Sequence, residues 1–133
     1  MSLVVDASIV VKWVVDEAGS DRAIALREES ELIAPSQLVS EVGNALWKAV
    51  RRRDVTVSDA VPALRSVLRA FDALVPNEEL HERALALALD LNHPIYDCFY
   101  LALAERERAP LISADKRLLA AAKKANGIEI RRL

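Results

Sequence analysis

Asp97 is the residue whose position most directly suggests chemistry, because it is an acid at the head of an apolar helix face. The segment from Pro94 to Ala104 reads Pro-Ile-Tyr-Asp-Cys-Phe-Tyr-Leu-Ala-Leu-Ala. In a helix that begins just after Pro94, Asp97 is followed on its own face by Tyr100, Leu101 and Ala104. An acid in a first helical turn can also satisfy free N–H groups and is favoured by the helix dipole. Asp97 alone is therefore consistent with a helix cap and with a functional site that faces a core or cleft.

Three further acids lie where an α/β fold would bring them to one place. Asp6 follows the apolar run 3–5, which is typical of a strand buried on both faces. Asp115 follows the apolar run 110–113, and Glu41 lies on the border of a long amphipathic helix. Parallel sheets bind ligands beyond the carboxyl ends of their strands, so Asp6 and Asp115 are expected at one edge. Taken singly, the two aspartates are better explained as helix caps, and Glu41 as a solvated helix residue.

As a set, these acids predict a cation site. The set is Asp6, Glu41, Asp97 and Asp115. Converging carboxylates repel one another unless a positive charge lies between them, and only Lys116 is a sequence-adjacent basic partner. Oxygen ligands without a Cys or His set favour Mg²⁺ or Mn²⁺ over zinc. His81 and His93 lack metal-ligand spacing and are expected to be surface or capping residues.

The elements expected to position the acids are short strands that alternate with helices. Strands are predicted at 3–5, 32–33, 74–75, 110–113 and 128–130. Helices are predicted at 9–15, 20–29, 36–53, 56–72, 77–91, from 95 onward and at 116–124. The helix at 56–72 begins with a Thr-x-x-Asp box that resembles a cap, and Pro62 favours a kink or a delayed start. This alternation predicts a parallel α/β sheet.

The composition indicates one domain over residues 1–133, with a core that buries roughly two thirds of the unfolded surface. The scattered glycines exclude a Gly-rich phosphate loop, and the single Cys98 excludes an internal disulfide. Asp6 and Lys12 interrupt the apolar start of the chain too early for a signal peptide or a membrane span, so a soluble cytoplasmic protein is expected. A net charge of −2 gives no global positive field, so any polyanion must be bound locally.

Four segments, taken in order, resemble the PIN domain. They are Leu-Val-Val-Asp-Ala-Ser at 3–8, Ser-Glu-Val-Gly-Asn-Ala at 40–45, Tyr-Asp-Cys-Phe-Tyr-Leu-Ala-Leu-Ala at 96–104 and Leu-Ile-Ser-Ala-Asp-Lys-Arg-Leu at 111–118. Their order and spacing, and the length of the chain, are similar to those of the VapC toxins of bacterial and archaeal toxin–antitoxin operons. The resemblance covers nearly the whole chain. It implies a three-layer α/β/α fold with a short-stranded, mostly parallel central sheet.

The resemblance also implies an activity, that of a Mg²⁺- or Mn²⁺-dependent endoribonuclease that cleaves RNA with a metal-activated water. The residues that would be catalytic and hold the metal are Asp6, Glu41, Asp97 and Asp115. Ser8, Asn44 and Ser113 match polar residues that surround this cluster in the family. Lys116 and Arg117 stand where some members carry a further acid, which leaves the number of metal ions at one or two. The implied partners are RNA, a VapB-like antitoxin and a second copy of the chain.

Basic residues near the acids are the candidates for contacts with RNA phosphates. They are Lys48, Arg51, Arg52, Arg53, Lys116 and Arg117, which flank Glu41 and Asp115 in the sequence. Each is also ordinary for a solvated helix end. Trp13 and Trp47 are assigned to the core by default, although a dimer interface or an antitoxin groove would also suit them.

Other functional classes fit less well. A phosphoacceptor receiver domain is an α/β fold with clustered acids, but its acidic pair, mid-chain acceptor Asp and late Lys are not assembled in this sequence. A non-catalytic PIN module that binds RNA should have lost acids, and this chain keeps all four. A DNA flap nuclease usually needs a larger chain with further acids. A PIN nuclease with a housekeeping role instead of a toxin role stays open.

Overall fold

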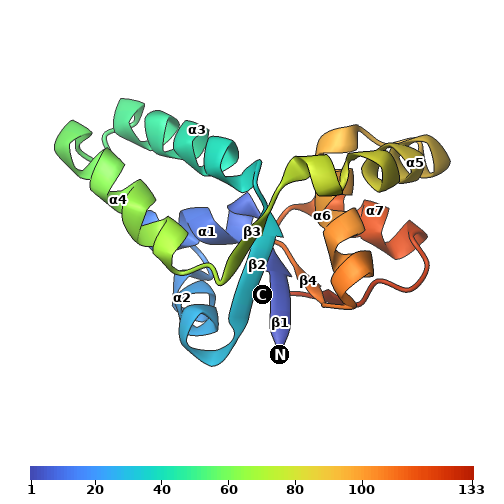
Figure 1. The fold of residues 1–133 in the computed structure, drawn as a ribbon. Helices are drawn as coiled ribbons and strands as arrows, with labels where there is room; N and C mark the ends of the chain where they lie inside the picture. The colour runs from blue at the N-terminus through green and yellow to red at the C-terminus, as the bar shows by residue number, and fades with distance from the viewer.

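A parallel sheet of five short strands forms the centre of the fold in the computed structural model, which describes residues 1–133 (Figure 1). The strands are β1 (Ser2–Val5), β2 (Glu31–Pro35), β3 (Ala73–Val75), β4 (Leu111–Ile112) and β5 (Ile130–Arg131). Their order in the sheet is β3-β2-β1-β4-β5, and every neighbouring pair is parallel. The predicted parallel sheet is therefore confirmed.

Helices cover both faces of the sheet. They are α1 (Ala7–Val14), α2 (Ser20–Glu29), α3 (Leu38–Arg51), α4 (Val57–Arg69), α5 (His81–Leu91), α6 (Ile95–Glu107) and α7 (Lys116–Lys124), with a short 3-10 helix η1 (Asn77–Glu79). Figure 1 shows α1 to α4 on one side of the strands and α5 to α7 on the other. This arrangement confirms the three-layer α/β/α fold. None of the helices combines the length and apolar character needed to cross a membrane.

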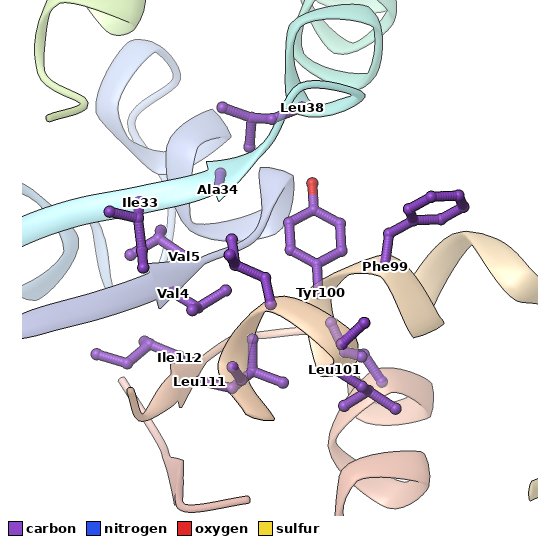
Figure 2. Packing of buried hydrophobic residues seen from close by; sticks show 14 of the residues in the cluster. Val4, Val5, Ile33, Ala34, Leu38, Phe99, Tyr100, Leu101, Leu111 and Ile112 are labelled. Atoms are coloured by element: carbon purple, nitrogen blue, oxygen red, sulfur yellow. The ribbon is translucent and has the colours of Figure 1, made fainter. Parts of the chain in front are cut away.

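The core forms where α6 packs against the central strands β1, β2 and β4. Leu3, Val4 and Val5 are at most 1% exposed because β1 is covered on both faces, as its unbroken apolar sequence predicts. From α6, Tyr100 and Leu101 are buried to the same degree, and Figure 2 shows them beside the strand side chains. Asp97 therefore does head an apolar helix face.

The strand order changes direction between β1 and β4. From β1 the chain moves to β2 and β3 on one side of the sheet, and it returns through β4 to β5 on the other side. Such a switch point opens a crevice at the carboxyl ends of the strands, because the two connections leave in opposite directions. Asp6 directly follows β1, and Ser113 and Asp115 closely follow β4, so the fold brings these residues to the switch point.

Several boundary predictions were wrong for local reasons. The Thr56 side chain makes no cap hydrogen bond, because its hydroxyl contacts that of Ser58 at 3.3 Å instead. Helix α4 starts at Val57, so no delayed start occurs, and Pro62 lies within the helix. The helix predicted over 77–91 is divided into η1 and α5, and the last strand lies two residues later than its predicted start.

Candidate active site

Asp6 is held by two hydroxyl groups at the switch point. Ser8 Oγ donates to Asp6 Oδ1 at 2.6 Å, and Ser113 Oγ donates to Asp6 Oδ2 at 2.7 Å. The residue is 5% exposed, and this burial raises the pKa of Asp6 to about 6, with smaller upward effects from the charges of Asp115 and Glu41. Asp6 occupies the N-cap position of α1, but its side chain makes no cap hydrogen bond. The capping explanation is therefore wrong for Asp6.

The same two hydroxyls fix the turn between β4 and α7. The backbone N–H of Ala114 donates to Ser8 Oγ at 2.9 Å, and that of Asp115 donates to Ser113 Oγ at 2.9 Å. Each serine thus gives its hydrogen to Asp6 and receives a backbone hydrogen from the turn. This network ties the end of β1 to the end of β4 and positions Asp115 relative to Asp6.

Glu41 reaches the site from α3. Its Oε1 accepts hydrogen bonds from Tyr100 Oη on α6 at 3.0 Å and from Gln37 Nε2 at 2.9 Å. Figure 2 shows the Tyr100 ring in the core with its hydroxyl directed towards α3. Glu41 as a whole is exposed, but its carboxylate is packed against protein, and this desolvation raises the pKa of Glu41. The charges of Asp97 and Asp115 raise it further, while the two hydrogen bonds lower it.

Asp97 has a histidine partner. His93 Nε2 lies 2.7 Å from Asp97 Oδ2, and an ionised carboxylate can only accept, so the imidazole donates. The Asp97 carboxylate accepts no backbone N–H, which excludes the simple capping role. His93 was expected to be a surface or capping residue, yet its side chain is only 14% exposed and contacts Asp97. Its spacing of four residues from Asp97 was a usable signal, but Pro94 places His93 outside α6 and obscured it.

Asp115 is a helix cap as well as a member of the acidic set. Its Oδ1 accepts from the backbone N–H of Arg117 at 2.8 Å and of Leu118 at 3.4 Å, at the N-terminus of α7. The capping explanation is therefore confirmed for Asp115. Its charge nevertheless contributes to the raised pKa values of both Asp6 and Glu41, so it lies close enough to act on the site.

The acidic set has free acceptor atoms and no Lys or Arg counterion. Glu41 Oε2, Asp97 Oδ1 and Asp115 Oδ2 make no hydrogen bond, while the second oxygen of each is held by protein donors. No Lys or Arg forms a salt bridge with any of the four acids. As the side chains stand, no three acidic, histidine or cysteine groups converge closely enough to enclose a metal ion. The oxygen donors of these acids are nevertheless of the kind that hard divalent cations take.

The remaining predicted residues lie at varied distances from this set. Asn44 is exposed and its side chain makes no hydrogen bond. Lys48 is seven residues beyond Glu41 on α3, about 10 Å along the helix axis. Arg51 lies a further turn away, with its guanidinium 4.9 Å from the centre of the Trp47 ring. Arg117 is exposed next to Asp115, whereas Lys116 also lines a hollow that contains Ser113.

The two tryptophans differ. Trp13 packs 5.8 Å from the Phe71 ring and donates its Nε1–H to the carbonyl of Ala23 at 2.8 Å, which confirms a structural role. Trp47 is 55% exposed, so its assignment to the core was wrong. Its ring is contacted by the guanidinium of Arg51, on the same helix.

Tyr100→Phe should weaken the fold at neutral pH, because it removes a hydroxyl that donates to a partly buried carboxylate. Hydrogen bonds to charged groups contribute about 1.5–3 kcal/mol, and Gln37 retains part of the stabilisation, so a loss of about 1 kcal/mol is expected. The pKa of Glu41 should rise further. Urea unfolding at pH 7 and pH 5 measures both effects, since the loss should shrink at the lower pH. An equal loss at both values would mean that Tyr100 does not stabilise the ionised form of Glu41.

Comparison with known proteins places this arrangement in a family. The model of the PIN domain matches residues 3–124. Ribonuclease VapC3 of Pyrobaculum aerophilum is 36% identical over 121 residues, covering 89% of this chain and 92% of that protein. Ribonuclease VapC1 of Mycobacterium tuberculosis is 37% identical over 124 residues, covering 89% of each. The crystal structure of VapBC2 from Rickettsia felis, bound to a DNA fragment from their promoter, matches with a TM-score of 0.73 over 100% of this chain and 99% of that chain. At 13% identity, that last likeness shows the fold alone.

Proposed function

Because the chain belongs to the PIN-domain family and resembles its VapC ribonucleases over most of its length, we propose that it is a toxin endoribonuclease that requires Mg²⁺ or Mn²⁺. The observation that carries the proposal is the bridge from Ser113 to Asp6. It joins the ends of two central strands next to Glu41 and Asp115, whose charges act on Asp6. An acidic centre of this kind suits the cleavage of a phosphodiester bond with a bound cation.

The protein side of the mechanism is the orientation of four carboxylates. The hydroxyl groups of two serines hold Asp6. Glu41 is held by Tyr100 and Gln37, and Asp115 is held by the N-terminus of α7. The imidazole of His93 holds Asp97. A divalent cation held by these acids would neutralise charge on the scissile phosphate and lower the pKa of the attacking water. In this mechanism none of the carboxylates is the nucleophile, and the acids serve to bind and orient.

The proposed partners follow from the same family. VapC toxins are paired with small VapB-like antitoxins, and we propose such a protein, encoded by a neighbouring gene, as the partner of this chain. A homodimer is proposed on the same ground. Sedimentation velocity of the purified chain, alone and with the product of the neighbouring gene, measures both associations.

Expression of this protein without a partner should arrest growth of a bacterial host through RNA cleavage. Co-expression of the antitoxin should restore growth, since it would cover the acidic centre. In cells, the measurements are the viable count and the integrity of total RNA after induction. In vitro, the purified protein is incubated with single-stranded RNA in the presence of Mn²⁺ or of excess EDTA. Cleavage in vitro with harmless expression would favour a housekeeping nuclease. RNA binding without any cleavage would favour a non-catalytic PIN module.

A further inference from the structure

A hollow of about 520 Å³ lies beside the acidic centre. Its walls are α7, the end of α1, the turn into α2, and residues 132–133 beyond β5. Pockets that bind small ligands typically measure about 300–1,000 Å³, so this hollow is large enough to hold part of a polymer chain. The sequence did not predict this hollow, and of its lining residues only Ser113 and Lys116 were among the predicted site residues.

The charge of this hollow is entirely basic. Its charged lining residues are Lys12, Arg22, Lys116, Lys123 and Arg132, and no acid is among them. Lys12 donates to Glu17 Oε1 at 3.2 Å and to the carbonyl of Ala18 at 2.7 Å, so part of its charge is compensated. The other four cations are exposed and form no salt bridge. In a chain with a net charge of −2, this concentration of positive charge is a local feature.

The rest of the lining indicates what kind of anion fits. Leu119, Ala120 and Leu133 provide apolar surface, and no aromatic, Asn or Gln side chain lines the hollow. Aromatic rings are the usual stacking platforms for bases, and Asn or Gln side chains are the usual readers of adenine edges, so the lining has neither of these means of recognising a base. Cations over apolar surface suit a sugar–phosphate backbone instead, since phosphate contacts position a strand without reading its sequence.

The hollow and the acidic centre share residues of the β4–α7 turn. Ser113 lines the hollow and also donates to Asp6 Oδ2 at 2.7 Å. Lys116 lines the hollow and directly follows Asp115, whose carboxylate caps α7. A nucleic acid strand with one phosphate at the acids would therefore carry its neighbouring phosphates into the hollow.

We propose that this basic hollow binds the sugar–phosphate backbone of the RNA substrate on one side of the scissile bond, without contacting base edges. The proposal rests on the ribonuclease function proposed above. It assigns Arg22 on α2 and Lys123 on α7 to phosphate contacts that hold the strand while the acids act on the next phosphate. Lys48 and Arg51, towards the other end of α3, are not part of this surface.

The test measures binding of labelled single-stranded oligouridylate to the Asp97→Asn protein in EDTA, over a range of KCl concentrations. A plot of log K against log salt has a negative slope, and each lost phosphate contact on a single strand reduces the magnitude of this slope by about 0.7. The double variant Arg22→Gln with Lys123→Gln should therefore reduce the magnitude by about 1.4. Affinity at about 0.05 M salt should fall by about tenfold or more. Oligoadenylate should show the same loss. Ala120→Glu, which adds an acid to the hollow, should also weaken binding.

A charge-matched control is Arg65→Gln with Arg69→Gln, because both side chains are exposed on α4 and neither lines the hollow. This control should keep the slope of the parent protein. Thermal melts should first show that both double variants are folded. Equal salt slopes for the control and for the Arg22–Lys123 variant would then overturn the proposal, even if the parent chain cleaves RNA. If the Arg22–Lys123 variant binds RNA normally but binds the antitoxin poorly, the hollow is a site for the antitoxin, and the RNA-binding proposal is overturned. If the parent chain neither binds nor cleaves RNA, the proposed function fails and the hollow proposal fails with it.

Discussion

Asp97→Asn should abolish metal-dependent RNA cleavage while the protein stays folded. The substitution keeps the size of the side chain and removes a charge from the centre. Bound cations contribute several kcal/mol to transition-state stabilisation in such reactions, and a loss of about 4 kcal/mol corresponds to about 10³-fold in rate. The fold should tolerate the change because the Asp97 carboxylate accepts no backbone hydrogen bond. Relief of repulsion with Glu41 should leave the melting temperature unchanged or higher.

A fluorescent RNA cleavage assay in Mn²⁺, together with circular dichroism melting, measures both parts of this result. The matched control is Asp90→Asn, which makes the same chemical change at an exposed acid on α5 and should leave cleavage intact. Full cleavage by folded Asp97→Asn, or cleavage by the parent protein in excess EDTA, would contradict the assignment of Asp97 to a metal-dependent centre.

Stability without metal should increase as the pH falls from 7 to 5. The pKa of Asp6 is raised from 3.8 to about 6, chiefly by burial, and that of Glu41 is raised as well. When the pKa of an acid is higher in the folded state than in the unfolded chain, the acid ionises more readily in the unfolded chain. At pH values above the unfolded pKa, this difference destabilises the fold. Protonation of the folded state therefore relieves the penalty as the pH falls through the raised value. For Asp6 alone, the gain between pH 7 and pH 5 is about 1 kcal/mol.

Divalent cations should stabilise the same centre most strongly at neutral pH. At about 100 times its dissociation constant, Mn²⁺ should add about 2.7 kcal/mol to the free energy of unfolding, because the unfolded chain has no assembled site. For a domain of 133 residues this corresponds to a rise in melting temperature of roughly 10 °C. Protons compete for the same oxygens, so the increment should shrink towards pH 5.

Thermal melts at several pH values, with and without Mn²⁺, distinguish these contributions. Asp6→Asn should flatten the pH dependence of the metal-free protein, and Asp97→Asn should remove the increment from Mn²⁺. The Asp90→Asn control should change neither. An increment that is absent at pH 7 in the parent protein, or that persists in Asp97→Asn, would show that these acids do not form one metal site.

The sequence predicted the layers of the fold better than it predicted the side-chain contacts around the four acids. Buried strands such as 3–5 have a continuous apolar pattern that depends only on burial, so it can be read locally. The donors to the acids come from distant elements, and their roles depend on packing. Tyr100 appeared only as an apolar neighbour of Asp97, although its hydroxyl reaches Glu41, 59 positions away.

The misplaced or missing features have the same origin. A Thr-x-x-Asp box is a local pattern, but the hydroxyl of Thr56 found another partner in Ser58. The basic hollow could not be predicted because its five cations come from four separate parts of the chain, namely α1, α2, α7 and the residues after β5, and only the fold brings them together. Cations that flank an acid in the sequence, such as Lys48, follow the helix away from the site instead.

The bridge between Asp6 and Ser113 also has a consequence for the timing of synthesis. The two residues are 107 positions apart, so the centre is completed only when β4 has joined the first strand of the sheet. Chains are made from the N-terminus, so Ser113 and Asp115 are added after Asp6, Glu41 and Asp97. A growing chain therefore lacks a complete centre until Asp115 has been made and β4 has paired with β1. This delay separates production of the polypeptide from the onset of its chemistry.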